Sequence, residues 1–290
     1  MNRTTASDFS ETSAGETFRE LYGRVLSRWP VKVEKVDVRS PHGITRVNIC
    51  GPVDGAPVIL LSGGGATSAV WFGLAASLTE RHRVHAVDLL GDVGCSTGTA
   101  GIRDVDDLME WLGIVAAELG LDAPAIVGHS YGAMVALAYA VRRPGQVQRL
   151  VLLDPNACFA GMSSRYLARA VPLLVRPTGA RLRALVEWES AGLQVDPDWL
   201  ALAAYGAEHF PASKTVVPRR PRRPELLDVR TDTTVVLAGR SRVHDVERVG
   251  RKIDAFMPRA RTVVLPGESH YTLPMASPAG LGRIVLDALG

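Results

Sequence analysis

The sequence predicts an α/β protein, with an eight-stranded, mostly parallel, doubly wound sheet and a helical cap inserted between two strands. Short, continuously apolar runs recur along the chain, as expected for strands covered on both faces. Segments with apolar residues at helical spacing separate these runs, and strands that alternate with helices form right-handed βαβ crossovers. A single long interval, residues 154–233, lacks such a run and therefore predicts the inserted cap.

The first elements precede the parallel sheet. A helix is expected from Ser13, because Ser13 and Glu16 have the spacing of a capping box and apolar residues then recur at helical intervals until Pro30. Two stretches of alternating apolar and polar residues follow on either side of a turn, which is typical of an antiparallel hairpin with one exposed face. These stretches are residues 33–39 and 44–50.

The remaining strands are expected at six apolar runs, which with the hairpin make eight: residues 58–61, 83–88, 124–127, 149–153, 234–238 and 262–265. Helices are expected at residues 69–80, 104–119, 131–142, 244–257 and 276–289. We therefore predict a core domain comprising residues 1–155 and 231–290, in which residues 1–30 form an N-terminal helical extension. Residues 156–230 are the predicted cap or lid.

The predicted cap carries three helical patches that prolines separate: Tyr166–Val175, Ala180–Ser190 and Trp199–His209. Its leucine, alanine, valine and tryptophan residues suggest that it contacts a largely apolar portion of a small-molecule substrate. Its arginines would suit a carboxylate on that substrate.

The composition excludes several classes of function. The net charge is only +3, and the densest basic stretch, residues 219–224, is broken by proline, so we expect a solvated loop rather than nucleic-acid binding. No apolar run is long enough for a membrane span, and the polar N-terminus lacks the pattern of a secretory signal, so we expect a cytoplasmic chain. The cysteines have neither disulfide-framework nor metal-ligand spacing: Cys50, Cys95 and Cys158. We expect no metal, and the oligomeric state stays open.

The sequence G-x-S-x-G occurs twice, and the context of each occurrence distinguishes them. Residues 128–132 directly follow a predicted buried strand and directly precede a predicted helix, which is the context of a nucleophile elbow. Residues 94–98 lie in a loop with no helix starting at the serine. Ser130 is therefore the candidate nucleophile, and Ser96 is expected to be structural.

A developing oxyanion needs two hydrogen-bond donors near Ser130. The amide of Tyr131, at the positive end of the following helix dipole, is one candidate. The second should come from the loop after the first parallel strand, where Gly64 is our choice. This glycine run also has Asp88 at the end of the next strand, but it lacks the lysine of a phosphate-binding loop and full dinucleotide spacing. We therefore expect no cofactor.

A serine hydroxyl needs a base, and His270 has the expected position after the last strand and before a terminal helix. His129 neighbours the nucleophile, but we expect it to point off the opposite side of the turn. The other candidates lie in or beside predicted strands and turns: His42, His82 and His85.

These motifs together resemble the α/β-hydrolase superfamily across essentially the whole chain. The matching residues are Ser62-Gly63-Gly64, Asp88 to Gly91 with Ser96, residues 128–132, and His270 with Pro274. Trp29-Pro30-Val31 and Gly91-Asp92 are similar to a bacterial carboxylesterase-like group with a leading helix. The resemblance implies the α/β-hydrolase fold and hydrolysis of an ester, thioester or related acyl bond.

The acid of the expected Ser-His-Asp triad is the point where the chain departs from the family pattern. The family usually places it about three residues beyond a glycine after the penultimate strand, and Arg242 occupies that position. The nearest carboxylate, Asp245, is also suited to cap the next helix. Asp154, at the end of strand 149–153, is the alternative, and we favour it over Asp245.

The sequence therefore predicts a serine hydrolase in which Ser130 attacks a carbonyl, His270 transfers the proton, and Gly64 and Tyr131 hold the oxyanion. The displaced acid keeps two alternatives open. One is non-hydrolytic chemistry on the same fold, by a lyase, acyltransferase or cyclase. The other is a catalytically silent binding protein on this scaffold.

Overall fold

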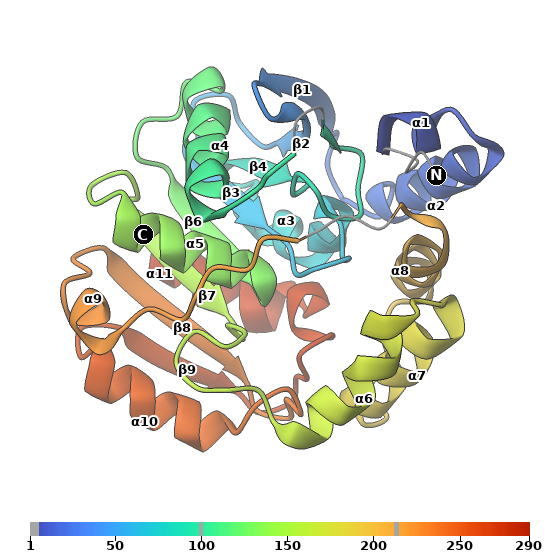
Figure 1. Cartoon of the computed structure of the whole chain (residues 1–290). Helices are drawn as coiled ribbons and strands as arrows, with labels where there is room; N and C mark the ends of the chain where they lie inside the picture. The colour runs from blue at the N-terminus through green and yellow to red at the C-terminus, as the bar shows by residue number, and fades with distance from the viewer. Residues whose placement is uncertain (1–5, 99–100, 212–214) are drawn as a thin grey trace.

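A mixed β-sheet runs through the molecule (Figure 1). The structure, a computed structural model, describes residues 6–98, 101–211 and 215–290. Eight strands follow the spatial order β1-β2-β4-β3-β6-β7-β8-β9. Their bounds are β1 Glu34–Ser40, β2 Gly43–Cys50, β3 Ala56–Leu61, β4 His82–Val87, β6 Ala125–His129, β7 Arg149–Leu153, β8 Asp232–Ala238 and β9 Arg261–Leu265. All eight predicted strands are therefore present.

The sheet has one strand more than the sequence predicts. β5, Thr97–Gly98, pairs antiparallel with the start of β2. A Cβ atom on Gly43 would lie 2.3 Å from the carbonyl oxygen of Thr97, so this close pairing depends on a glycine. A two-residue strand has no hydrophobic period, which is why the sequence pattern did not reveal it.

β1 and β2 form the predicted antiparallel hairpin, and β2 also pairs antiparallel with β4. The other pairs of long strands are parallel. Because β3, β6, β7 and β8 are neighbours and parallel, their carboxyl ends lie along one edge of the sheet. Loops that follow these strands can therefore meet at a common site.

Two layers of helices cover the two faces of the sheet. One hydrophobic core includes residues of α4 (Val105–Glu118), α5 (Tyr131–Arg142) and α10 (Val246–Phe256), and the other includes residues of α3 (Phe72–Leu78) and α11 (Arg283–Leu289). Alternate residues of β3 serve the two cores, Ile59 on one face and Leu60 on the other, and both are fully buried. A continuously apolar strand is therefore what this position requires.

Several helix boundaries differ from the predicted ones. α3 is short, because a 3-10 turn, η1 (Ser68–Trp71), occupies the start of the predicted 69–80 helix. The predicted 276–289 helix is likewise divided into a π-helical turn, η3 (Pro278–Gly282), and α11, after a short 3-10 turn, η2 (Leu273–Met275). These departures are local changes of hydrogen-bond pattern that apolar spacing alone does not resolve.

The N-terminal helices are α1 (Ala6–Ser10) and α2 (Ser13–Leu26), and Thr12 rather than Ser13 caps α2 by accepting a hydrogen bond from the Gly15 amide. The predicted capping box of Ser13 and Glu16 was therefore wrong by one residue in the position of the cap. The Tyr22 hydroxyl lies 2.9 Å from Ser68 Oγ and donates to Asp88 across 3.1 Å, so α2 is bonded to the core through buried polar groups.

Three helices follow β7: α6 (Ser164–Val175), α7 (Gly179–Ser190) and α8 (Pro197–His209). They lie together at one side of the molecule, with α8 packed on α2 (Figure 1). Arg28 beside α2 pairs with Asp196 at the start of α8 at 2.6 Å. The short helix α9 (Arg223–Leu227) lies beside α10 instead. The boundary of the cap at residues 156–230 stays a prediction.

The basic stretch and the three cysteines, for which the sequence predicts no binding site, have these surroundings in the structure. Arg219 and Arg222, in the loop before α9, pair with Glu225 in the first turn of that helix. Cys50 and Cys158 are buried, Cys95 is partly exposed, and all three are free thiols. Among the residues that the structure describes, no helix combines the length and the apolar character that crossing a membrane requires.

Candidate active site

Ser130 lies on the sharp turn between β6 and α5. Its backbone has φ 52° and ψ −112°, a left-handed region that costs a non-glycine residue on the order of 1–3 kcal/mol. Strand β7 and helix α5 hold this conformation: the Ser130 amide donates to the Leu153 carbonyl at 3.1 Å, and the Met134 amide donates to the Ser130 carbonyl at 3.2 Å. The turn therefore projects the Ser130 side chain beyond the carboxyl end of β6.

Two glycines let the turn pack closely. A Cβ atom on Gly128 would lie 2.5 Å from the Gly132 carbonyl oxygen, and one on Gly132 would lie 2.2 Å from the Leu61 carbonyl oxygen. Both contacts involve backbone atoms, which cannot rotate away as a side chain does. Only glycine fits at these positions.

We expect Gly132→Ala to destabilise the protein by about 3 kcal/mol, because the added methyl group would force β3 and the elbow apart. Gly250 in α10 is a matched control, since a Cβ there meets nothing within 4 Å. Gly250→Ala should instead stabilise the helix by about 0.5–1 kcal/mol. Urea unfolding of both variants measures the difference, and equal stabilities would contradict the packing argument.

Ser130, His270 and Asp154 form one hydrogen-bonded chain. His270 Nε2 lies 2.9 Å from Ser130 Oγ, and His270 Nδ1 lies 2.6 Å from Asp154 Oδ2. Because an ionised carboxylate only accepts, Nδ1 carries the proton and Nε2 is free to accept the hydroxyl proton of Ser130. All three side chains are buried. This is the geometry of an activated serine.

Asp154 lies after β7 with no solvent exposure. Besides His270, it accepts hydrogen bonds from the Ala238 amide at 3.1 Å, the Ser241 hydroxyl at 2.8 Å and His244 Nε2 at 3.0 Å. Burial raises the pKa of this carboxyl, but the hydrogen bonds from the two histidines outweigh burial and hold its pKa well below the ordinary value. Asp154 is therefore ionised beside His270.

Asp245 lies elsewhere, at the start of α10, where its carboxylate accepts a hydrogen bond from the Arg248 amide at 2.9 Å. Arg242, at the family's usual acid position, directs its guanidinium to the carbonyl of Trp188 at 2.6 Å and over the Trp188 ring. The loop between β8 and α10 thus contributes Ser241 and His244 to the surroundings of Asp154.

His129 was expected to point away from the nucleophile, and that expectation was wrong. Its ring packs against the ring of His270 with centroids 4.7 Å apart, and its Nε2 donates to the His270 carbonyl at 3.0 Å. Burial, together with the nearby His270, lowers the pKa of His129 to about 3, so the ring is neutral. Gly63 makes room for it, since a Cβ there would lie 2.9 Å from His129 Nδ1.

A cavity of about 490 Å³ opens above Ser130 and His270, with walls from the core and from α6, α7 and α8. Gly64 and Tyr131 both line it, and a Cβ on Gly64 would lie 3.9 Å from Tyr131 Cβ. The two residues named from the sequence as oxyanion donors are therefore neighbours beside Ser130. Most of the other lining side chains are aliphatic or aromatic.

The cap arginines do not line this cavity, contrary to the expectation that they would meet a substrate carboxylate. Among the described residues, the only carboxylate in the lining is Asp92, and no arginine or lysine appears there. Asp92 accepts hydrogen bonds from the amides of Gly65 at 2.9 Å and Val93 at 2.8 Å. Burial raises the pKa of Asp92 to about 6.

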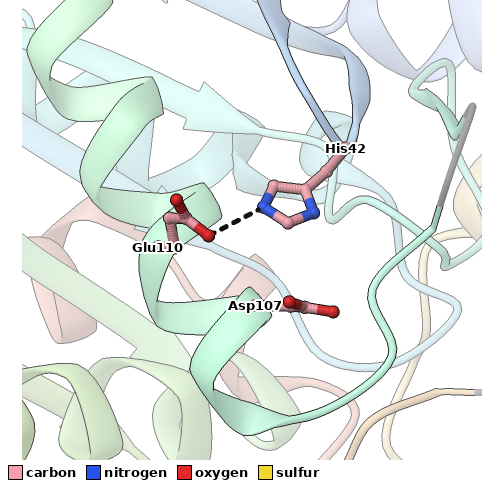
Figure 2. A group of neighbouring side chains, drawn as sticks. All are labelled: His42, Asp107 and Glu110. Carbon is pink, nitrogen blue, oxygen red and sulfur yellow. Dashed lines mark ion pairs between the residues drawn. The ribbon is translucent and has the colours of Figure 1, made fainter.

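A second group of potential ligands lies away from this cavity, at the β1–β2 turn and α4 (Figure 2). Ligand atoms of His42, Asp107 and Glu110 lie within 4.8 Å of one another, and His42 Nε2 is 3.5 Å from Glu110. Both oxygens of Asp107 already accept hydrogen bonds from the Arg103 guanidinium, at 2.9 and 3.1 Å. A cation would have to displace Arg103, so we interpret the group as a polar link between the hairpin and α4.

Sequence reasoning assigned no role in the site to three residues that line the cavity or contact the triad: Asp92, Glu189 and His244. Glu189 had a detectable signal, because it lies four residues after Leu185, which places it on the buried face of α7. His244 and Asp92 lie in loops, where no periodicity indicates burial.

Comparisons with known proteins identify the family and the fold. A family model described as the alpha/beta hydrolase family matches residues 58–283. The carboxylesterase YbfK of Bacillus subtilis is 31% identical over 181 residues, which cover 62% of this chain and 60% of that protein. The sequence match thus spans about three fifths of the relative's length.

Solved structures extend the likeness to the whole fold. The crystal structure of carboxylesterase CesB (YbfK) from Bacillus subtilis has a TM-score of 0.89 and 22% identity, covering 96% of this chain and 99% of that chain. The naproxen esterase of Bacillus subtilis has a TM-score of 0.88 and 21% identity over 96% and 99% of the two chains. At these identities the likeness concerns the fold.

Proposed function

The chain belongs to the alpha/beta hydrolase family, and on that premise we propose that it is a serine hydrolase that cleaves carboxylic esters of neutral, largely apolar small molecules. The observation that carries the proposal is the continuous hydrogen-bonded chain from Ser130 through His270 to the buried Asp154. The name carboxylesterase attached to a 31% identical relative supports the reaction class.

In the proposed mechanism, Ser130 Oγ attacks the ester carbonyl carbon while His270 Nε2 takes its proton. Asp154 stabilises the imidazolium ion through Nδ1–H. His270 then returns the proton to the leaving alcohol oxygen, and the C–O bond breaks to leave an acyl-serine. Water, deprotonated by His270, attacks this acyl group and releases the acid and the Ser130 hydroxyl.

The developing negative charge is assigned to the backbone amides of Gly64 and Tyr131. Tyr131 is the first residue of α5, so the unpaired amides and the dipole of this helix favour an anion beside Ser130. Asp92 accepts a hydrogen bond from the Gly65 amide and so fixes the loop that carries Gly64. Preorganised donors of this kind lower the barrier by about 3–4 kcal/mol each.

The hydrogen bond between His270 and Asp154 also supports a catalytic role over the silent binding scaffold that the displaced acid had kept open. A silent scaffold has no need for a buried carboxylate that orients the histidine. The cavity supports an apolar acyl or alcohol portion, because its walls are mainly aliphatic and aromatic.

We expect neutral esters to be hydrolysed far better than esters that carry a carboxylate. A matched pair is p-nitrophenyl hexanoate and mono-p-nitrophenyl adipate, which differ by the terminal carboxylate. Because Asp92 is the only carboxylate among the described lining residues, kcat/KM for the adipate should be about 10-fold lower at pH 7.5 from charge repulsion and the cost of burying a charge.

The ratio of kcat/KM for the hexanoate to kcat/KM for the adipate should decrease as the pH falls. The pKa of Asp92 is raised to about 6, so Asp92 is charged at pH 7.5 and mostly protonated at pH 5.5, whereas the adipate stays ionised. Taking the ratio of the two substrates cancels the titration of the catalytic machinery. A preference for the adipate, or no hydrolysis of either ester, would argue against the proposed substrate class.

A further inference from the structure

Glu189 is a carboxylate from α7 with no solvent exposure. It accepts three backbone hydrogen bonds from two loops of the core. Oε1 accepts from the amides of Arg242 at 3.0 Å and His270 at 3.1 Å, and Oε2 accepts from the amide of Tyr271 at 3.3 Å. Within the described residues, no arginine or lysine forms an ion pair with it.

A buried carboxylate packs a helix against the core less favourably than an apolar side chain does. Burying a charge without a cation costs several kcal/mol, and an apolar residue such as the nearby Leu185 would seal the same face at no such cost. Charge-assisted bonds to backbone amides offset that cost only where those amides lack other partners. The three amides lie in loops outside the sheet, so the carboxylate serves the loops rather than the helix.

The bond from Glu189 completes the fixation of His270. The four polar atoms of His270 have partners from three segments of the chain. Its amide contacts Glu189, its carbonyl contacts His129, Nδ1 contacts Asp154 and Nε2 contacts Ser130. Glu189 is the one partner supplied by the three helices over the cavity.

The same part of α7 is joined to the core at further points. Arg242 and Arg240 donate to the carbonyls of Trp188 and Ala191, at 2.6 and 3.1 Å. These bonds fix the end of α7 against the loop that also supplies Ser241 and His244 to Asp154. The end of α7 is therefore bonded both to this loop and, through Glu189, to the loop of His270.

We propose that Glu189 is a positioning residue for the base, holding the backbone of His270 so that its ring spans Ser130 and Asp154, and thereby coupling α7 to catalysis. This inference rests on the proposed hydrolase function. It gives the helices over the cavity a role in arranging the base as well as in binding substrate.

The test compares Glu189→Ala and Glu189→Gln with Glu187→Gln, a control at an exposed glutamate of the same helix. A shift of about 1 Å in a catalytic group costs about 100-fold, so Glu189→Ala should lower kcat by about 100-fold with KM within about twofold. Glutamine keeps one oxygen for the Arg242 and His270 amides but turns an NH₂ group toward the Tyr271 amide. Glu189→Gln should therefore lower kcat by about 10-fold, and Glu187→Gln should leave kcat unchanged.

The rate of fluorophosphonate labelling of Ser130 should fall in parallel, because this reaction needs the base but not the ester pocket. Thermal unfolding reports whether each variant is folded. If Glu189→Ala is not folded, the isosteric Glu189→Gln variant tests the proposal. Lower Tm with unchanged kcat and labelling would reduce Glu189 to a packing role and overturn the inference, as would a rise in KM alone. An unlabelled wild type would instead overturn the proposed function itself.

Discussion

Ser130→Ala is expected to lower kcat for p-nitrophenyl hexanoate by about 10⁵- to 10⁶-fold, the loss that removal of a nucleophilic serine causes. The variant should still bind substrate, because alanine lacks only the hydroxyl and fills the same site. Intact-mass analysis after reaction with a fluorophosphonate should show one adduct on the wild type and none on Ser130→Ala.

Ser96 provides the matched control, since it occupies the second G-x-S-x-G sequence. Its hydroxyl donates to the Asp88 carbonyl at 2.7 Å and accepts the Arg46 amide at 2.9 Å, which are structural bonds. Ser96→Ala should keep the adduct. An adduct that survives in Ser130→Ala but is lost in Ser96→Ala would reverse the assignment of the nucleophile.

Asp154→Asn is expected to lower kcat by about 10⁴-fold, because an amide in place of the carboxylate stabilises the wrong tautomer of His270. In that tautomer Nε2 carries the proton and cannot accept the one from Ser130. Asp245→Asn should leave kcat within about twofold of the wild type, since an asparagine caps α10 equally well. Steady-state kinetics of the two variants measures the contrast.

Both aspartate variants need a measurement of stability, since Asp154 also binds Ser241, His244 and the Ala238 amide. A folded Asp154→Asn protein with near-wild-type kcat would contradict the assignment of the acid. Equal losses in both variants would mean that the loop between β8 and α10, rather than the carboxylate of Asp154, matters for the reaction.

The elbow was predictable because its context is local. Strand β6, the turn and α5 follow one another within residues 125–142, and their apolar patterns change period at Ser130. His270 was predictable from its place after the last strand. In both cases the sequence near the residue contains the information.

The acid and the surroundings of His270 depend on contacts between distant segments. Both Asp154 and Asp245 follow or begin regular elements, and only the three-dimensional arrangement brings one of them to His270. The helical spacing of Glu189 from Leu185 indicates burial, which the exposed Glu187 does not share, but the partners of its carboxylate lie in loops 53 and 81 residues farther along the chain. The side-chain direction of His129 likewise depends on the ring it packs against.

The order of the strands has a consequence for how the enzyme is made. β9 is one of the two edge strands of the sheet and comes after the other described strands in the chain, and His270 follows it. A nascent chain that ends before β9 already contains Ser130 and Asp154, but it has no base to activate the serine. Hydrolysis therefore requires that the chain has been made through His270 and that the loop after β9 has folded against Ser130 and Asp154. Recovery of activity during refolding therefore reports that β9 and the loop of His270 have reached their places in the fold.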